Sequence, residues 1–487
     1  MRRWWLPVSG IFLVVLAVRL YLAFQSPFLS SDESYFHLRV SDAISNGHSP
    51  WADPLGGPRL LSPIFHAFLA FTALFMPLDV AAKIIPNVFA SLLVFPVFLI
   101  SLHLSRNRNL SLATALLASI VPAWIGNTFN HAVPLTLVVP LFFAVVYAWL
   151  NVVKKPLLFL GLFTALVFLH PLSLVLALSL AVYLAFCKIE GVKGLLAEAE
   201  LGLFSVFFAL WAQFLMYKRI VVFHGVDVIW RNLPSGLLST YFSGITILGA
   251  ILQIGAYPLA EGVYALYKTA FRGQDKIISL LLSVTSVTVF MLYLKLIELS
   301  AGLMILGVTL SVLFSKWSIL SYEFLIKTKI SRYASVVMWV SVVLALITTA
   351  IPAAMLIDGR LDSTISADEV AALRWLSKSS SPEAVVFAPV EYGHYISFFA
   401  NRRPVVDDYF FLEREVNELF SDGERVLRTA FVTEAVELFD KYGASYLVVP
   451  PKVKDVSYAD SKCFKRVWPG SIRIYEKDSA CVVRVVG

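Results

Sequence analysis

A short polar segment directly after the first long apolar run carries the residue types that acid–base or metal chemistry needs. It reads Ser30-Ser31-Asp32-Glu33-Ser34-Tyr35-Phe36-His37-Leu38-Arg39. Two adjacent carboxylates, Asp32 and Glu33, can bind a divalent cation, or one of them can act as a general base. A solvated loop is the alternative interpretation, because a charge at a membrane boundary costs little free energy. We favour a reactive site at this position.

Two further polar segments interrupt the apolar sequence. The turn Asn127–His131 separates two apolar runs, and we expect Asn130 or His131 to lie beside Asp32; a capped helix turn is the alternative. The loop over 218–237 is either a solvated interfacial loop or a flexible flap over a substrate, and its polar side chains include His224, Asp227 and Arg231.

Cationic side chains suggest where an anionic group would bind. Lys295 could hold a phosphate, because a flexible ammonium group suits a phosphate as a point charge. The alternative is that Lys295 and Glu298 neutralise each other. Arg39 is a second candidate for phosphate binding. In the C-terminal part, Glu391, Tyr392 and His394 lie between an expected strand and an expected helix, where a polar site or a stabilising turn would form.

The composition is that of an integral membrane protein. Of 487 residues, 58% are hydrophobic and 15% are charged, whereas an average soluble domain has about 25% charged residues. The net charge of +7 does not indicate nucleic acid, because the cations stand at the ends of apolar runs rather than in one patch. The expected location is therefore the cell membrane, with the lipid bilayer as surroundings.

Hydropathy predicts a polytopic helical protein. A bilayer span needs about 20 apolar residues. Eleven spans are expected, at 6–24, 82–104, 110–126, 132–152, 156–171, 172–187, 199–217, 238–267, 277–293, 297–314 and 334–356. The span over 238–267 is long enough to break at Pro258, so the expectation is about 11–13 transmembrane helices. The short apolar run 61–76 is interpreted as an interfacial or re-entrant helix.

The basic residues orient these spans. Counted along the eleven spans, six groups fall on one side: Arg2/Arg3, Arg106/Arg108, Lys154/Lys155, Lys188/Lys193, Lys268/Arg272/Lys276 and Lys316/Lys327/Lys329/Arg332. This positive-inside pattern predicts a cytoplasmic N-terminus and places Asp32, the turn at His131 and the whole C-terminal part outside.

The composition changes near Asp358, where a soluble region begins. We expect a transmembrane domain over 1–357, with a first outer loop at 25–81, and an extracytoplasmic α/β domain over 358–487. Its expected strands lie at 384–388, 404–406, 445–449, 471–476 and 481–486, and its helices at 366–378, 393–400, 412–420 and 431–442. Cys463 and Cys481 are either a disulfide or two free thiols, and the absence of a CxxC spacing argues against zinc.

Taken in order, these segments resemble the catalytic subunit of oligosaccharyltransferase and its single-subunit archaeal and bacterial relatives, among the GT-C glycosyltransferases. Ser31-Asp32-Glu33 with Arg39 and Asp42 is similar to the first acidic motif of that family. The resemblance implies a GT-C fold and makes Asp32 a metal ligand and catalytic carboxylate. It also implies that Lys295 contacts a lipid-linked diphosphate, and that the segment from Glu391 to His394 contributes to acceptor binding.

The chain departs from the family in its second acidic motif, where Asn130 and His131 replace two carboxylates. Because hard cations prefer oxygen ligands, a site of Asp32, Asn130 and His131 would hold Mg²⁺ weakly and Mn²⁺ better. The alternative is a metal-free reaction with Asp32 or Glu33 as the base. The indoles of the acceptor motif are also missing, because Pro389-Val390-Glu391 stands in their place.

The function implied is transfer of a sugar or oligosaccharide from a polyprenyl- or dolichyl-(di)phosphate donor to a protein or glycan acceptor on the outer face. The first alternative is an inactive relative that binds a lipid-linked sugar or a partner, which the missing second acidic motif favours. A transporter is the second alternative. It is disfavoured because few ionisable residues lie near the middle of a span, and Glu261 is the main exception.

Overall fold

The structure is a computed structural model and describes residues 5–49, 55, 62–192, 196–225, 245–270, 275–409, 414–459 and 461–481. The chain divides into two compact units. The first, called here the membrane unit, comprises Met1–Ser26, Lys83–Met216 and Leu238–Asp362. The second, called the α/β unit, comprises Pro27–Ala82, Tyr217–Leu237 and Ser363–Gly487. The segment expected as a first outer loop therefore packs with the C-terminal part of the chain.

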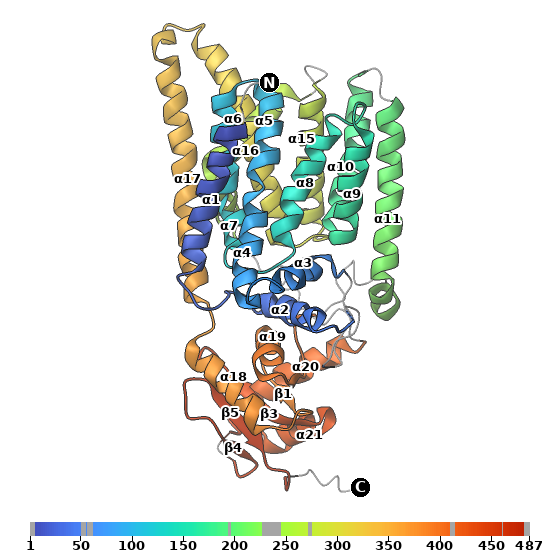
Figure 1. Ribbon diagram of the computed structural model, residues 1–487, viewed down its shortest axis with the longest axis vertical. Helices are drawn as coiled ribbons and strands as arrows, with labels where there is room; N and C mark the ends of the chain where they lie inside the picture. The colour runs from blue at the N-terminus through green and yellow to red at the C-terminus, as the bar shows by residue number, and fades with distance from the viewer. Residues whose placement is uncertain are drawn as a thin grey trace. The chain divides into compact units, whose positions relative to one another are not determined.

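Apolar helices, most of them long, build the membrane unit (Figure 1). They are α1 (Trp5–Ala23), α4 (Leu78–Ser91), α5 (Val94–Ser105), α6 (Arg108–Ser119), α7 (Pro122–Thr128), α8 (Leu135–Trp149), α9 (Pro156–Leu169), α10 (Leu172–Ile189), α11 (Leu196–His224), α13 (Ile247–Ile254), α14 (Ala256–Thr269), α15 (Lys276–Tyr293), α16 (Leu299–Leu325) and α17 (Ala334–Asp362).

These helices account for the expected spans, with differences in length. Seven helical segments of the described chain are long and apolar enough to cross a membrane. Two bent pairs, α6 with α7 and α13 with α14, raise that count to nine if each pair is one span. The other two expected spans correspond to α8 and α9, which at 15 and 14 residues are shorter than a bilayer requires. The second bend follows from Gly255, whose φ of +100° ends α13.

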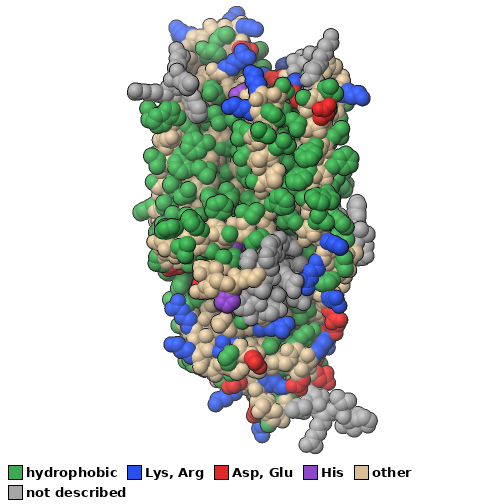
Figure 2. Space-filling view, turned by 45° about the vertical axis from the view of Figure 1, so that its right-hand side comes forward, with side chains coloured by type: hydrophobic (Ala, Val, Ile, Leu, Met, Phe, Trp, Pro, Cys, Tyr) green, Lys and Arg blue, Asp and Glu red, His purple; other side chains and the backbone are tan. Residues whose placement is uncertain are grey.

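The surface of the membrane unit needs lipid around it. Helix α16 lies within the helix bundle, because 78% of its apolar 18-residue stretch is buried. The corresponding stretches of α1 and α11 are only 22% and 28% buried. Trp211, Trp339 and Phe207 are examples of large apolar side chains left exposed. Hydrophobic side chains cover the middle of this unit, and Lys and Arg side chains gather at its upper end (Figure 2). An apolar surface of this extent marks an integral membrane protein.

The α/β unit is built on a mixed five-stranded sheet in the order β2-β1-β3-β5-β4. Its strands are β1 (Val385–Phe387), β2 (Arg403–Pro404), β3 (Ala444–Val449), β4 (Phe464–Arg466) and β5 (Arg473–Lys477). Strand β1 runs parallel to β2 and β3, whereas β5 runs antiparallel to β3 and β4. The helices of the unit are α2 (Asp32–Ser45), α3 (Ile64–Ala73), α18 (Ala367–Ser379), α19 (Gly393–Tyr395), α20 (Val416–Arg428) and α21 (Val432–Tyr442).

Hydrophobic burial explains why this sheet forms. Four residues of β3 in succession, from Tyr446 to Val449, are buried, as expected for a central strand covered on both faces. Leu447 and Val449 belong to a core that includes Phe387, Phe439 and Tyr458. The sequence did not predict β4, whose three residues are too few to show an alternating pattern. The strand expected over 481–486 lies, apart from Cys481, outside the described residues.

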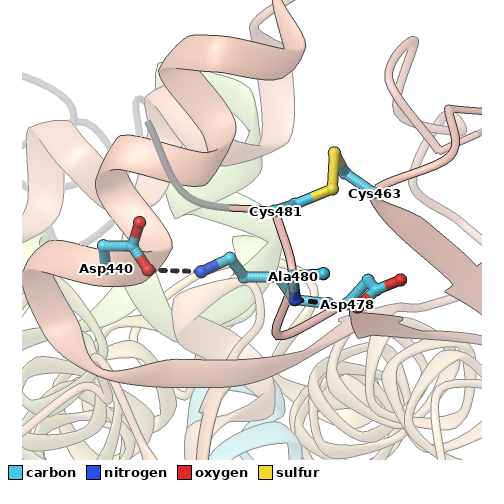
Figure 3. The surroundings of a disulfide bond; sticks show 6 residues. Asp440, Cys463, Asp478, Ala480 and Cys481 are labelled. Atoms are coloured by element: carbon cyan, nitrogen blue, oxygen red, sulfur yellow. Dashed lines mark hydrogen bonds and ion pairs between the residues drawn. A yellow bond between two sulfur atoms is a disulfide. The ribbon is translucent and has the colours of Figure 1, made fainter. Parts of the chain in front are cut away.

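The two tail cysteines form a disulfide. Cys463 and Cys481 are joined across 18 residues of sequence, beside strand β5 (Figure 3). Of the two alternatives that the sequence allowed, a disulfide or two free thiols, the structure has the disulfide. The third cysteine, Cys187, is a buried free thiol in α10 of the membrane unit.

Reducing this disulfide is expected to lower the free energy of unfolding of the α/β unit by about 2–4 kcal/mol, because the unfolded chain regains the entropy of an open loop. Melting of the purified protein with and without reductant measures the effect, and the double variant Cys463→Ser/Cys481→Ser should melt at the lower temperature in both conditions. Cys187→Ser is the matched control, and equal melting of the double variant and this control would contradict the prediction.

Candidate active site

The carboxylate of Asp32 is held in place by main-chain amides. Ser31 caps α2 by accepting a hydrogen bond from the Ser34 amide, which places Asp32 in the first turn of the helix. The carboxylate accepts hydrogen bonds from the amides of His394, at 3.2 Å, and Tyr395, at 2.7 Å. Asp32 therefore joins two segments that lie 362 residues apart in the chain, and its orientation is fixed without a side-chain cation.

The side chain of His394 completes a cluster of titratable groups. It is fully buried, and its Nε2 atom hydrogen-bonds a carboxylate oxygen of Asp408. Its Nδ1 atom lies 3.8 Å from a carboxylate oxygen of Asp407. Both aspartates follow β2, and His394 follows the neighbouring parallel strand β1. The cluster therefore forms beyond the carboxyl ends of two parallel strands, where α/β sheets commonly carry their sites.

Gly393 allows α19 to approach the segment that carries the two aspartates. A β-carbon on Gly393 would stand 2.5 Å from Cβ of Asp407 and 2.8 Å from the carbonyl oxygen of Val406. The backbone of Gly393 is ordinary right-handed helix, with φ −57° and ψ −45°, so space and not conformation requires glycine here. This close approach brings His394 within hydrogen-bond distance of Asp408.

The electrostatics of the cluster raise the pKa values of both Asp32 and His394 above their usual ranges. Burial raises the pKa of Asp32 well above its usual range, and the Asp408 carboxylate raises it further, whereas His394 and the two amides lower it. Burial lowers the pKa of His394, but the carboxylates of Asp408, Asp32 and Asp407 outweigh burial and raise it to about 10. A carboxyl with a raised pKa beside a protonated imidazole is typical of acid–base sites.

The same cluster could hold a metal ion. Asp32, His394 and Asp408 each offer one ligand atom, and these atoms lie within 4.8 Å of one another. Two carboxylate oxygens and one imidazole nitrogen suit Mn²⁺ or Zn²⁺ better than Mg²⁺, which prefers oxygen. Such an ion would displace the proton of His394, because a metal-bound imidazole must be neutral. The three ligand atoms of Asp32, His394 and Asp408 fit a metal ion. The distances between these atoms are also typical of an ion pair without a metal.

Glu33 and His37 lie one helical turn apart on α2. Nε2 of the buried His37 is 3.5 Å from a carboxylate oxygen of Glu33, whose side chain is about half exposed. Nδ1 of His37 hydrogen-bonds Nε2 of His66 at 2.7 Å. Burial lowers the pKa of His37 to about 3, and His394 lowers it too. His37 is therefore neutral at physiological pH.

Acidification is expected to destabilise the α/β unit through His37. The unfolded chain binds a proton at about pH 6.5 and the folded one not until about pH 3, so in this window the unfolded state binds more protons and the free energy of unfolding falls as pH falls. Melting temperatures between pH 4 and 7 measure this slope, which His37→Gln should make shallower. His103→Gln, at an exposed histidine of α5, is the control; equal slopes in both variants would contradict the prediction.

The structure describes some of the other expected site residues of the α/β unit. Arg39 on α2 stands over the ring of Phe36, with its guanidinium carbon 5.9 Å from the ring centre, and it interacts electrostatically with Asp407. The hydroxyl of Tyr392 donates to Glu369 of α18, whereas Glu391 is exposed. His224 ends α11. Asp227 and Arg231 lie outside the described residues.

Asn130, His131 and Lys295 belong to the membrane unit. Asn130 and His131 are buried in the turn between α7 and α8, and Asn130 adopts a left-handed conformation with φ +51°. Lys295 is exposed between α15 and α16, also left-handed, with φ +55°. The metal set of Asp32, Asn130 and His131 draws on both units and stays a prediction.

Asp407 and Asp408 were not identified from the sequence. The run Arg403-Pro404-Val405-Val406 ends on this acidic pair. Once Pro404–Val406 is read as a strand parallel to 384–388, both the pair and His394 follow the carboxyl ends of strands. That topological signal would have found them.

Solved structures with a similar fold belong to membrane glycosyltransferases. The archaeal oligosaccharyltransferase AglB from Archaeoglobus fulgidus, in complex with an inhibitory peptide and a dolichol-phosphate, matches with a TM-score of 0.68 at 13% identity, over 91% of this chain and 69% of that chain. ArnT from Cupriavidus metallidurans bound to undecaprenyl phosphate matches with a TM-score of 0.60 at 11% identity, over 98% of each chain.

Arabinofuranosyltransferase AftD from Mycobacteria matches with a TM-score of 0.52 at 13% identity, over 98% of this chain and 40% of that chain. No protein-family model and no curated protein sequence matches the chain. At these identities the similarity concerns the fold. The expected architecture is confirmed: the chain has the fold of the GT-C glycosyltransferases.

Proposed function

We propose that the protein is a membrane glycosyltransferase that moves a sugar or oligosaccharide from a polyprenyl-phosphate or polyprenyl-diphosphate donor to an acceptor on the outer face. The observation that carries the proposal is the carboxylate of Asp32, fixed by the amides of His394 and Tyr395 beside the His394–Asp408 pair, in a chain of GT-C fold. AglB was solved with a dolichol-phosphate and ArnT with undecaprenyl phosphate, which supports a lipid-phosphate donor here.

Asp32 is the proposed catalytic base. Its raised pKa suits removal of a proton from an acceptor hydroxyl or amide as the acceptor attacks the sugar. His394 positions Asp32 through its main-chain amide and balances its charge through the imidazolium, and Asp408 keeps that imidazolium protonated. Glu33, partly exposed one residue further along α2, is the second candidate base.

A divalent cation in place of the His394 proton is the alternative to this metal-free arrangement, because a metal-bound imidazole is neutral. Asp32, His394 and Asp408 would hold it, and the ion would stabilise negative charge on a leaving phosphate. One crystal structure of AglB is a complex with zinc and sulfate. The alternative set of Asp32, Asn130 and His131 would suit Mn²⁺, and Mg²⁺ less well.

The remaining roles are assigned by side-chain chemistry. Lys295 and Arg39 are the proposed contacts of the donor phosphate, and the loop of His224, Asp227 and Arg231 is a proposed flap. Glu391 and Tyr392 are proposed to face the acceptor, a protein or a glycan, whereas the buried His394 would act on it through Asp32. Because Pro389 and Val390 offer no indole ring to an acceptor, recognition by stacking on tryptophan is not part of the proposal.

The proposed orientation has a cytoplasmic N-terminus and an extracytoplasmic α/β unit. The six groups of basic residues support it through the positive-inside rule. The Cys463–Cys481 disulfide supports it as well, because disulfides persist mainly in oxidising compartments.

A relative that binds a lipid-linked sugar without turning it over is the second candidate. The observation in its favour is the replacement of the second acidic pair by Asn130 and His131, which removes two oxygen ligands from any metal site on the family pattern.

Turnover of a polyprenyl-linked sugar by the purified full chain tests both candidates. The assay is run with added Mn²⁺, with EDTA, and without either. Turnover in any condition supports the enzyme, and loss of turnover in EDTA with recovery in Mn²⁺ supports a metal cofactor. Tight donor binding without turnover in all conditions would overturn the enzyme in favour of the binding-only relative.

A further inference from the structure

A buried arginine lies in the first helix of the membrane unit. Arg19 of α1 is 4% exposed. Its Nε atom donates to the side-chain oxygen of Asn87 at 2.9 Å, and its Nη2 atom donates to the carbonyl and the hydroxyl of Thr128, both at 2.9 Å. Its Nη1 atom is buried and has no hydrogen-bond partner among the described residues. The two residues that accept these hydrogen bonds from Arg19, Asn87 and Thr128, carry no charge.

A second guanidinium reaches the same turn from the opposite end of the sequence. Arg360, near the end of α17, donates from Nε to the carbonyl of Gly126 at 2.9 Å and from Nη2 to the side chain of Asn127 at 3.3 Å. Gly126, Asn127 and Thr128 are consecutive residues at the end of α7. Arg19 and Arg360 therefore converge on the last turn of one short helix.

His131 belongs to the same cluster. One side of its ring hydrogen-bonds the backbone of Asn127, and the ring lies within electrostatic range of both Arg360 and Arg19. The side chain is 7% exposed, and its Nε2 atom is buried without a partner among the described residues. Within the described part of the chain, two nitrogens, one of Arg19 and one of His131, are thus left without partners at a single turn.

The charges of the membrane unit do not balance around this turn. Among its described residues Glu198 is the buried carboxylate, and it already accepts hydrogen bonds from Tyr183 and Lys276. Arg19 and Lys83 are buried cations, and Lys83 donates to main-chain carbonyls at the end of α1. A buried guanidinium bonded to neutral groups carries a large desolvation cost, which a bound anion would offset.

Capping of a helix end explains part of this arrangement. The carbonyls at the end of α7 have no partner within the helix, and cationic side chains commonly satisfy such groups. That role uses Nε and Nη2 of Arg19 and the two bonding nitrogens of Arg360. It leaves Nη1 of Arg19 and Nε2 of His131 unexplained, and capping would not need two full positive charges.

We propose that Arg19, with Arg360 and His131, forms a phosphate-binding site whose occupant is the phosphate headgroup of a polyprenyl lipid. Arg19 stands one turn before the end of α1, within a unit whose surface is apolar, so a lipid can supply the anion together with a chain that fits the surroundings. Guanidinium groups suit phosphate because their planar donors match its oxygens. The inference rests on the proposed lipid-phosphate donor and adds residues to its binding.

Binding of sugar-free polyprenyl phosphate to the purified full chain tests the site. The Arg19→Gln variant is expected to lose about 10- to 100-fold in affinity, the size of a lost charged hydrogen bond, and Arg19→Lys should retain part of it. Arg332→Gln, which removes an exposed cation from the same unit, is the matched control. Equal affinity in Arg19→Gln and Arg332→Gln would overturn the proposal.

Three further measurements keep the result decisive. Polyprenol without phosphate should not compete, and competition by it as strong as by the phosphate would overturn an anion site. Inorganic phosphate that binds as tightly as the lipid would overturn the lipid as occupant. If Arg19→Gln does not fold, His131→Gln takes its place with an expected loss of about 3- to 10-fold, the size of one neutral hydrogen bond, and unchanged affinity would count against the site.

Binding and turnover, measured separately on the same purified protein, distinguish this inference from the proposed function. A chain that never turns over donor but shows Arg19-dependent binding would refute the enzyme and keep the site. A chain that turns over donor with full affinity in Arg19→Gln would refute the site and keep the enzyme.

Discussion

Asp32→Asn is expected to reduce sugar transfer by about 10²- to 10⁴-fold, the usual contribution of a positioned acid–base group. The amide keeps the shape of the side chain, and its oxygen can still accept a hydrogen bond from the Tyr395 amide. It cannot accept from both main-chain amides, and it cannot take up a proton. The measurement is the rate of transfer from a polyprenyl-linked donor at saturating donor, together with the melting temperature.

Asp42→Asn is the matched control for this prediction. Asp42 lies on the same helix, α2, and is exposed, so its substitution makes the same chemical change away from the cluster. It should leave the rate within about twofold. Full activity in Asp32→Asn would remove Asp32 from the reaction, and an equal loss in both variants would show that negative charge on α2, and not the position of Asp32, matters.

The sequence predicted the architecture because hydropathy acts over long segments. The apolar runs of the membrane unit are each long enough to be recognised without neighbours, and buried strands such as Ser445–Val449 stand out as short apolar runs between helices. Strand β4 was not predicted, because three residues are too few to show an alternation of apolar and polar side chains. The lengths of α8 and α9 differ from the expectation because apolar residues continue past the helix ends into turns.

The site was predicted in part. Asp32 and His394 were each identified, but with separate roles, because nothing local in either segment shows that a carboxylate of α2 accepts the amides of α19. This contact depends on how residues 27–82 pack with the C-terminal part. Asp408 was missed for a related reason, since its meaning depends on the pairing of β1 with β2, which is a tertiary property.

The burial of Arg19 is a feature that the sequence could not predict. A single arginine near the end of an apolar run is usually interpreted as an interfacial side chain that reaches water. The structure instead buries it against Asn87 and Thr128. Those contacts join segments 68 and 109 residues away, so hydropathy could not distinguish the two outcomes.

Gly393→Ala is expected to disrupt the cluster more than any other single methyl addition near it. The new β-carbon would stand 2.5 Å from Cβ of Asp407 and 2.8 Å from both Cα of Asp407 and the carbonyl oxygen of Val406. Two of these atoms are main chain, so no rotamer change relieves the clash and the backbone must move. Overpacking of this kind typically costs about 1–3 kcal/mol, and the shift separates His394 from Asp408.

Gly423→Ala is the matched control, because Gly423 of α20 approaches the same segment with ordinary clearance. Its added β-carbon would meet the side chain of Val406 at 3.5 Å, and alanine in a helix interior is favoured over glycine by about 0.5–1 kcal/mol. We expect Gly423→Ala to melt at or above the temperature of the unmodified chain, while Gly393→Ala melts lower and loses transfer activity. If Gly393→Ala retained both its stability and its activity, α19 would not need its close approach to Asp407, and the position of His394 would have to depend on Asp32 and Asp408 alone.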